Sequence, residues 1–216
     1  MALTLYFHPF SSYCQKVLTA LYENDTPFAP HVVDLMDQAE GAALKQLWPI
    51  GKFPVLRDET AGLTIPESTI IIEYLAQRYP GPTALIPVNA DGAREARFRD
   101  RFFDLHVHEH VQRIVFERLR PSESKDPFGV EQARGRLTTA YDMLEAHLAT
   151  STWAAGDAFT IADCAAAPAL FYAELVQPFT QTHKAISAYL DRLMNRPAFA
   201  RVVREAKPYR ALFPKE

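Results

Sequence analysis

Two kinds of residue pattern divide this chain, and the change between them near residue 80 is the strongest constraint on its fold. Short apolar runs typical of strands occur only before that point, where they alternate with helical segments. From residue 91 onward the apolar residues recur at helical spacing, as Leu137, Tyr141 and Leu144 do. The sequence therefore predicts an α/β domain followed by an all-α domain.

The first part has the element order β-α-β-α-β-β-α. The first two strands are joined by a helix and should be parallel, whereas a polar turn at residues 58–62 suits an antiparallel hairpin. This order predicts a small mixed sheet flanked by helices. The strands are expected at residues 4–7, 31–34, 54–57 and 63–65. We place a first domain at residues 1–80, a linker at 81–90 and a helical domain at 91–216.

The overall composition argues against several classes of function. The chain has 216 residues, of which 48% are hydrophobic, and its formal net charge is −3. This charge disfavours general binding to nucleic acid or to an anionic membrane. No apolar run has the length of a membrane span, and the N-terminus has no signal-peptide pattern. We therefore expect a cytoplasmic protein, in which Cys14 and Cys164 are free thiols.

The junction between the first strand and the first helix gathers hydroxyls and a thiol. Ser11, Ser12 and Cys14 lie where a helix begins. The backbone N–H groups of the first helical turn have no partners within the helix, and the positive end of the helix dipole lies there. An anion at this position is therefore stabilised. The anion that we expect at this position is a thiolate. The simpler alternative is that a serine only caps the helix and that Cys14 only packs in the core.

The pair Phe53-Pro54 precedes a predicted strand. A cis bond at this proline would turn the backbone of Phe53 outward, where its N–H and C=O could pair with an extended peptide as an added strand does. The alternative is an ordinary trans proline at the edge of the sheet.

Two predicted helices differ in how their first turns are capped. Ser68 is placed as the N-cap of one helix, but the residue three positions later is Ile71, so no carboxylate completes a capping box. In contrast, Thr160 is followed by Asp163 at the position that does complete the box. An external carboxylate could occupy the open Ser68 site, and Glu67 beside it could pair with an ammonium group. A plain cap and a solvated glutamate are the alternative.

These motifs, in this order, resemble the glutathione S-transferase family. The resemblance rests on the segment from Ser11 to Cys14, on Lys52-Phe53-Pro54, on Glu67-Ser68, and on the residues from Gly156 to Asp163 in a helical domain. It covers essentially the whole chain. The resemblance implies a thioredoxin-like first domain with a glutathione site, a hydrophobic co-substrate pocket between the domains, and a homodimer.

The resemblance also implies how the thiol is activated. Ser11 matches the serine that donates a hydrogen bond to the glutathione sulfur in such enzymes. Tyr6 is the second candidate, because other branches of the family use a tyrosine at the end of this strand, and Ser12 is a third. Cys14 could form a mixed disulfide with glutathione, although the first position of a C-x-x-C motif is here a serine.

The same resemblance implies how the rest of the tripeptide is held. Phe53 would hold the cysteinyl main chain through its backbone, and Lys52 would meet the glycyl carboxylate. Glu67 and Ser68 would hold the γ-glutamyl end. No metal is expected.

The predicted long helix after residue 91 could line the co-substrate pocket. We assign to this pocket the residues Phe10, His110, Arg113 and Phe116. Histidines on this helix also raise the possibility of a zinc site, but the position that should supply the second ligand of a zinc-protease motif is Gln112. A histidine face without metal is the better interpretation.

The sequence thus leads to one main hypothesis and two alternatives. The main hypothesis is a detoxifying glutathione transferase that ionises glutathione and adds it to small hydrophobic electrophiles. The alternatives are a glutathione-dependent disulfide reductase or peroxidase, and a binding protein that has the transferase fold without catalysis.

Overall fold

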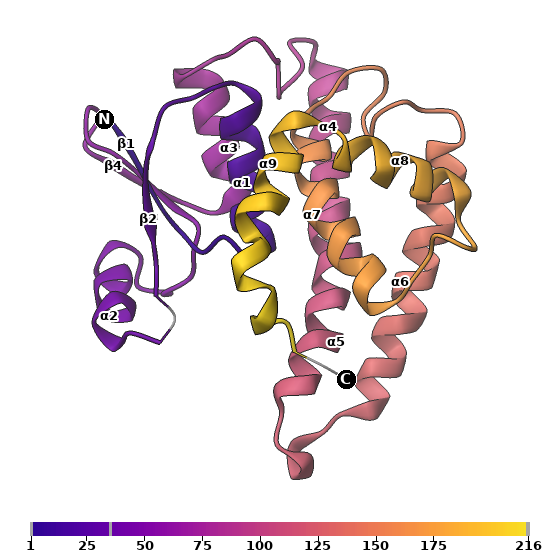
Figure 1. Ribbon diagram of the computed structural model, residues 1–216. Coiled ribbons are helices and arrows are strands. Elements are labelled where there is room, and N and C mark those ends of the chain that lie inside the picture. The colour runs from indigo at the N-terminus through magenta and orange to yellow at the C-terminus, as the bar shows by residue number, and fades with distance from the viewer. Residues whose placement is uncertain (1, 35, 215–216) are drawn as a thin grey trace.

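The protein has the two-part architecture predicted from its sequence (Figure 1). The computed structural model describes residues 2–34 and 36–214. Its sheet has the strand order β2-β1-β3-β4, in which β2 is parallel to β1 and the other pairs are antiparallel. The predicted mixed sheet is therefore confirmed. The strands are β1 (Leu3–Phe7), β2 (Ala29–Val32), β3 (Val55–Asp58) and β4 (Leu63–Pro66).

The two faces of β1 carry different side chains. Leu3, Leu5 and Phe7 are buried in the main core, on the side of the sheet covered by helices α1 (Ser12–Glu23) and α3 (Ser68–Arg78). Because side chains alternate along a strand, Tyr6 points to the other face. There it packs into a small cluster beside helix α2 (Gln38–Leu47), which stands apart from the other helices in Figure 1.

The second part of the chain is helical, and its centre is α7. This helix is alanine-rich and buried along almost its whole length, as its apolar sequence predicts. The elements are α4 (Ala90–Phe102), η1 (Phe103–His108), α5 (Glu109–Leu119), η2 (Ser122–Ser124), α6 (Pro127–Leu148), α7 (Ile161–Val176), α8 (Lys184–Met194), α9 (Pro197–Ala206) and η3 (Lys207–Leu212).

The predicted long helix after residue 91 contains an irregular segment. Helices α4 and α5 follow one another without a break, but η1 between them is π-helical. Such segments occur often at functional sites, because they shift the side chains that follow to a new face of the helix. Here η1 carries the buried residues Asp104 and His108.

Two predicted boundaries need correction. Strand β2 begins at Ala29 and includes Pro30, which β2 tolerates because it is an edge strand. Ser68 is the first residue of α3, and Glu67 is its N-cap. The reason is the backbone of Glu67, whose φ of 70° lies in the left-handed region and outside the helix.

A buried ion cluster joins the two parts of the chain. Lys16 on α1 is 1% exposed, and its Nζ lies 2.6 Å from Asp100 Oδ1 and 2.9 Å from Asp104 Oδ2. It also donates to the Thr69 hydroxyl at 2.9 Å. A buried charge without a partner is strongly destabilising, so this cluster fixes α1 against α4 and η1.

Candidate functional site

The N-terminus of α1 presents a hydroxyl that can still donate. Ser11 is the N-cap, and its Oγ accepts a long hydrogen bond from the backbone N–H of Cys14 at 3.5 Å. This bond uses an oxygen lone pair, so the hydroxyl keeps its proton for donation, either to the neighbouring Cys14 thiol or to a ligand. Ser11 is half-buried and lines a cavity, so the proton can be donated to a ligand there.

Cys14 lies one turn further along α1 and is fully buried. Burial raises the pKa of its thiol to about 12, and this effect outweighs the opposing hydrogen bonds from Ser11 and His8. The thiol is therefore protonated at neutral pH. A protonated thiol is a poor nucleophile, so the site is unsuited to a reaction at this sulfur.

Ser12 contacts the helical domain. Its Oγ lies 2.5 Å from Nε2 of His108, and both side chains are buried. Burial lowers the pKa of His108 to about 4, although the charge of Asp104 opposes this shift. The imidazole is therefore neutral at physiological pH, and a neutral hydrogen bond links α1 to η1 across the domain junction.

Tyr6 lies elsewhere. Its ring packs against that of His31, with the centroids 4.6 Å apart, in the cluster beside α2. Tyr6 is not among the residues that line the cavity next to Ser11. The alternation of side chains along β1 is the physical reason, since it directs Tyr6 away from the α1 side of the sheet.

The segment before β3 contributes to the same cavity. The Phe53-Pro54 peptide bond is cis, which is one of the two alternatives that the sequence left open. The Phe53 ring is half-buried, lines the cavity and lies 6.3 Å from the ring of His8. Lys52, directly before it, is exposed to solvent.

The N-terminus of α3 has no cap from the protein. Glu67 makes no capping hydrogen bond with its side chain, which is exposed. Ser68 is 6% exposed, and within residues 2–34 and 36–214 its hydroxyl has no hydrogen-bond partner. Glu67 also has the unfavourable backbone conformation described above, a kind of strain that is commonest at binding sites. This helix end is open to an anionic ligand.

A cavity of about 310 Å³ lies between the two domains beside Ser11. Most of its wall is apolar, and this part is formed by Phe10, Phe53, Val111, Val115, Phe116, Leu119, Tyr172, Leu212, Phe213 and Pro214. The polar part is formed by His8, Ser11, Ser12, His108 and Gln112. Such a cavity suits a small hydrophobic molecule whose reactive atom lies at the polar end of the cavity.

Two of the four residues that were predicted to line the co-substrate pocket lie in the wall of this cavity. Phe10 and Phe116 line the cavity, whereas His110 and Arg113 are not among its lining residues. His110 is buried elsewhere, and Arg113 forms an ion pair with Asp126 at 3.0 Å. Around the axis of α5, the lining residues between Val111 and Leu119 cover an arc of about 140°, and His110 and Arg113 lie outside this arc.

Several lining residues were not found from the sequence. Helical spacing from Phe116 gives Gln112, four residues earlier, and Leu119, three residues later, so this signal was present for these two. Tyr172 and Phe213 had no such signal, because they reach the cavity from α7 and from the segment after η3.

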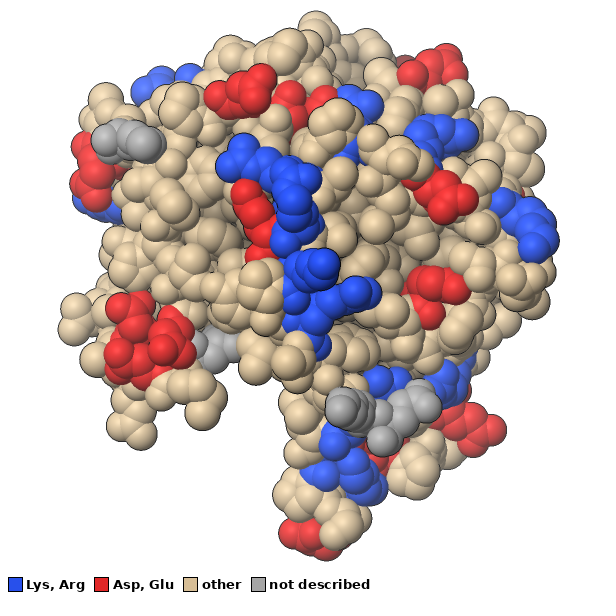
Figure 2. All heavy atoms as spheres, in the orientation of Figure 1, with Lys and Arg blue, Asp and Glu red and all other residues tan. Residues whose placement is uncertain are grey.

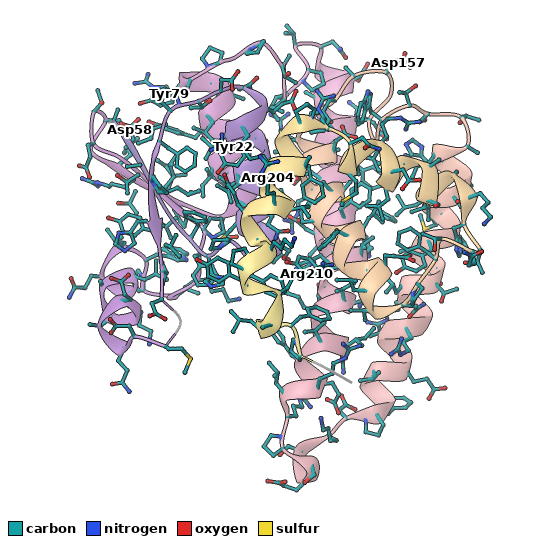
Figure 3. All side chains as sticks on the ribbon, viewed as in Figure 1. Tyr22, Asp58, Tyr79, Asp157, Arg204 and Arg210 are labelled. Atoms are coloured by element: carbon teal, nitrogen blue, oxygen red, sulfur yellow. The ribbon has the colours of Figure 1, made fainter. Side chains whose placement is uncertain are left out.

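Figure 2 shows a line of basic side chains over α9 and η3, next to the notch between the domains. The exposed cations of these elements are Arg201, Arg204, Lys207 and Arg210, of which Figure 3 labels Arg204 and Arg210.

Among the described residues no group of three or more potential ligands could hold a metal ion. No described helix has the length and apolar composition of a membrane span.

Comparison with known proteins agrees with this architecture. Residues 5–83 match the family model for the glutathione S-transferase N-terminal domain, and residues 107–197 match that for its C-terminal domain. Glutathione S-transferase 3 of Zea mays is 32% identical, over 93% of each chain. A stringent starvation protein A homolog of Histophilus somni is 28% identical, over 95% of this chain and 92% of that protein.

The fold is also shared with solved structures. A glutathione S-transferase of Methylobacillus flagellatus, solved with GSH bound, superposes with a TM-score of 0.86 at 24% identity, over 93% of this chain and 98% of that one. This likeness extends over both domains. The two family models and the similarity to the Zea mays enzyme establish that the chain belongs to the glutathione S-transferase family.

Proposed function

We propose that this protein is a glutathione transferase in which Ser11 donates a hydrogen bond to the sulfur of glutathione. The observation that carries the proposal is the place of Ser11, which caps α1 and lines an apolar cavity with a hydroxyl whose oxygen only accepts from the Cys14 N–H. A free thiol titrates near pH ~8.5, so a shift of one or two units makes the thiolate dominant at neutral pH. Each unit corresponds to about 1.4 kcal/mol, which a hydrogen bond and a helix dipole can supply together.

The remaining groups of glutathione have partners in the same region. The γ-glutamyl carboxylate would bind at the open N-terminus of α3, with the Ser68 hydroxyl as a donor and Glu67 facing the ammonium group. The backbone of Phe53 would hold the cysteinyl unit, and Lys52 would meet the glycyl carboxylate. The basic side chains over α9 support this assignment, because glutathione is a net anion.

The second substrate would be a small hydrophobic electrophile. The apolar walls of the cavity would hold its body, and its reactive carbon would face the thiolate near Ser11. The thiolate attacks this carbon and forms a thioether, while the leaving group departs or an activated double bond takes up the electron pair. This chemistry fits a role in detoxification in the cytoplasm.

A homodimer is part of the proposal. Ile70 on α3 and Phe98 on α4 each expose about half of their side chain, at 54% and 50%. Single exposed apolar side chains are normal on protein surfaces, so the proposal of a dimer rests on the family, and it assigns these two residues to the interface. Sedimentation velocity at micromolar concentration would give the mass of a dimer, and the mass of a monomer would contradict this part of the proposal.

The central test is the variant Ser11→Ala. We expect its kcat/KM with glutathione and a chloronitrobenzene to fall about 10²-fold, a loss typical of a removed oxyanion donor. The ultraviolet absorbance of bound thiolate at neutral pH should fall in parallel. Ser124→Ala, at an exposed serine of η2, is the control and should behave as the wild type. Unchanged turnover and unchanged thiolate absorbance in Ser11→Ala would exclude the proposed role of Ser11.

A second candidate function is binding without turnover. The observation that favours it is the similarity to stringent starvation protein A homologs, which is of the same order as that to named transferases. Retention on immobilised glutathione without turnover of any electrophile would support it.

The reductase alternative is not favoured, because burial keeps Cys14 protonated. If Cys14→Ser retains any disulfide reductase activity, Cys14 is not the reactive group.

A further inference from the structure

The contact between Ser12 and His108 has no role in the function proposed so far. The two side chains come from different domains, lie 2.5 Å apart at Oγ and Nε2, and both line the cavity next to Ser11. Ser12 is 8% exposed and His108 is 5% exposed. A buried polar pair at the reactive end of an apolar cavity requires a physical explanation, since burying polar groups is costly.

The surroundings of His108 keep its imidazole neutral. Burial is the largest effect on its pKa and lowers it, whereas the charge of Asp104 raises it and that of Lys16 lowers it. The ring of Tyr13 packs edge-on against the imidazole, with the centroids 4.8 Å apart, and presents no charge to it. A neutral imidazole carries a proton on one of its two nitrogens, so the direction of the hydrogen bond to Ser12 depends on the tautomer.

The two tautomers give Ser12 different roles. With the proton on Nδ1, Nε2 accepts from the Ser12 hydroxyl, and that hydroxyl has no proton left for a ligand. With the proton on Nε2, the imidazole donates to Ser12 Oγ, and the hydroxyl proton is free to turn into the cavity. Nδ1 of His108 has no hydrogen-bond partner among the described residues, so no protein group there fixes the first tautomer.

We propose that His108 is a positioning residue that donates from Nε2 to Ser12 Oγ and thereby makes the Ser12 hydroxyl a second donor to the glutathione sulfur, beside that of Ser11. This inference rests on the proposed function and extends it. The negative sulfur itself selects the arrangement, because it attracts the hydroxyl proton and leaves Oγ to accept from the imidazole.

The two donors differ in their surroundings. Ser11 is half-exposed and also caps α1, whereas Ser12 is buried and is oriented by a residue of the other domain. A hydrogen bond to a charged group is stronger where water is excluded. Thiolate formation would therefore depend on the docking of η1 against α1, and not on the N-terminal domain alone.

The test is a pH titration of the thiolate absorbance of bound glutathione in the full-length protein. We expect Ser12→Ala and His108→Leu to raise the pKa of the bound thiol by about one unit, which is tenfold less thiolate at pH values below both pKa values. His108→Gln places an amide N–H near the position of Nε2 and should stay within about threefold of the wild type. The control is His110→Gln, at a buried histidine of the same helical stretch that lies outside the cavity wall, and it should not change the titration.

The outcomes separate this inference from the proposed function. If the wild type gives no thiolate band with glutathione, the proposed function fails, and this inference fails with it. If the wild type gives the band and His108→Leu titrates as the wild type does, only the inference is overturned. The same conclusion follows if His108→Gln is as impaired as His108→Leu.

A second measurement needs only the wild-type protein, so it does not depend on whether a variant folds. Nitrogen-15 NMR of the histidine rings in the glutathione complex should show His108 protonated at Nε2. Protonation at Nδ1 in that complex would overturn the inference.

Discussion

Helices α7 and α3 begin in opposite ways, and the contrast indicates where a ligand can bind. At α7, the Thr160 hydroxyl accepts from the N–H of Ala162 at 3.3 Å, and the Asp163 carboxylate accepts from the N–H of Thr160 at 2.8 Å. At α3, no side-chain cap is present, and the Ser68 hydroxyl is unpaired within the described part of the chain. A helix end that the chain completes stabilises the fold, whereas an open one is free to bind an anion.

The C-terminal end of α3 is held to the rest of the protein by hydrogen bonds of Asp58. The Asp58 carboxylate accepts from the hydroxyls of Tyr74 and Tyr79 at 2.7 and 2.5 Å, and Figure 3 shows Asp58 and Tyr79 close together beside this helix. It also accepts from the backbone N–H groups of Thr60 and Ala61. The helix is thus anchored at its C-terminal end, and only its N-terminal end is left for a ligand.

The largest expected effect is the loss of stability when the closed end of α7 is opened. Asp163 is fully buried and also accepts from the N–H of Ala154 and from the hydroxyl of Tyr189. Asp163→Ala leaves these donors unpaired, so we expect the free energy of unfolding to fall by about 3–5 kcal/mol in urea denaturation. Asp157→Ala, at the exposed residue labelled in Figure 3, should change it by less than about 0.5 kcal/mol. A loss below about 1 kcal/mol for Asp163→Ala would show that the box is not structural.

The next effect concerns Asp58 and depends on pH. Burial raises the pKa of this carboxyl, but the hydrogen bonds from Tyr79, Tyr74, Ala61 and Thr60 outweigh burial and bring it to about 2. Since the pKa is lower in the folded state, the stabilisation is present above about pH 4 and is lost as the pH falls from 4 to 2. We expect Asp58→Asn to have a lower Tm than the wild type at pH 7, and the two Tm values to converge near pH 2. A constant difference in Tm over this range would contradict the assignment.

The features that the sequence predicted are those that depend on neighbouring residues. The capping box needs only Thr160 and Asp163 three positions apart, and the alternation of strands and helices needs only local periodicity. Asp58 was not recognised, because its tyrosine partners are 16 and 21 residues away, and no spacing rule links them. The N-cap of α3 was placed one residue late, because the sequence does not reveal the left-handed backbone of Glu67.

The candidate site shows the same limit. Ser11, Phe53 and Phe116 follow from motifs or from helical spacing, and all three line the cavity. The contact between His108 and Ser12 was not predicted, because the two residues are 96 positions apart and no spacing rule links them. His110 and Arg113 were assigned to the pocket because they share a helix with Phe116, and membership of a helix does not fix which of its side chains face a cavity formed with other elements.

Ser68→Ala should affect ligand binding rather than stability. The hydroxyl has no partner in the described residues, so the Tm should change little, whereas the Kd for glutathione should rise about tenfold, or about 1.4 kcal/mol. Asn89→Ala is the matched control, because Asn89 caps α4 with a hydrogen bond to the N–H of Gly92 at 2.6 Å. It should lose about 1 kcal/mol of stability without a change in Kd. The comparison fails if calorimetry shows the same Kd for Ser68→Ala and the wild type.

The smallest expected effect is that of Lys52. Because this lysine is exposed, its attraction to the glycyl carboxylate is screened by water and salt. We expect Lys52→Ala to raise the Kd for glutathione about two- to fivefold at 0.02 M salt, and by less than about twofold at 0.5 M salt. Lys184→Ala, at an exposed lysine at the start of α8, should leave the Kd unchanged at both concentrations. An effect of Lys52→Ala that persists in high salt would mean that glutathione shields this ammonium from water, and the open helix end would then not be the main anchor of the tripeptide.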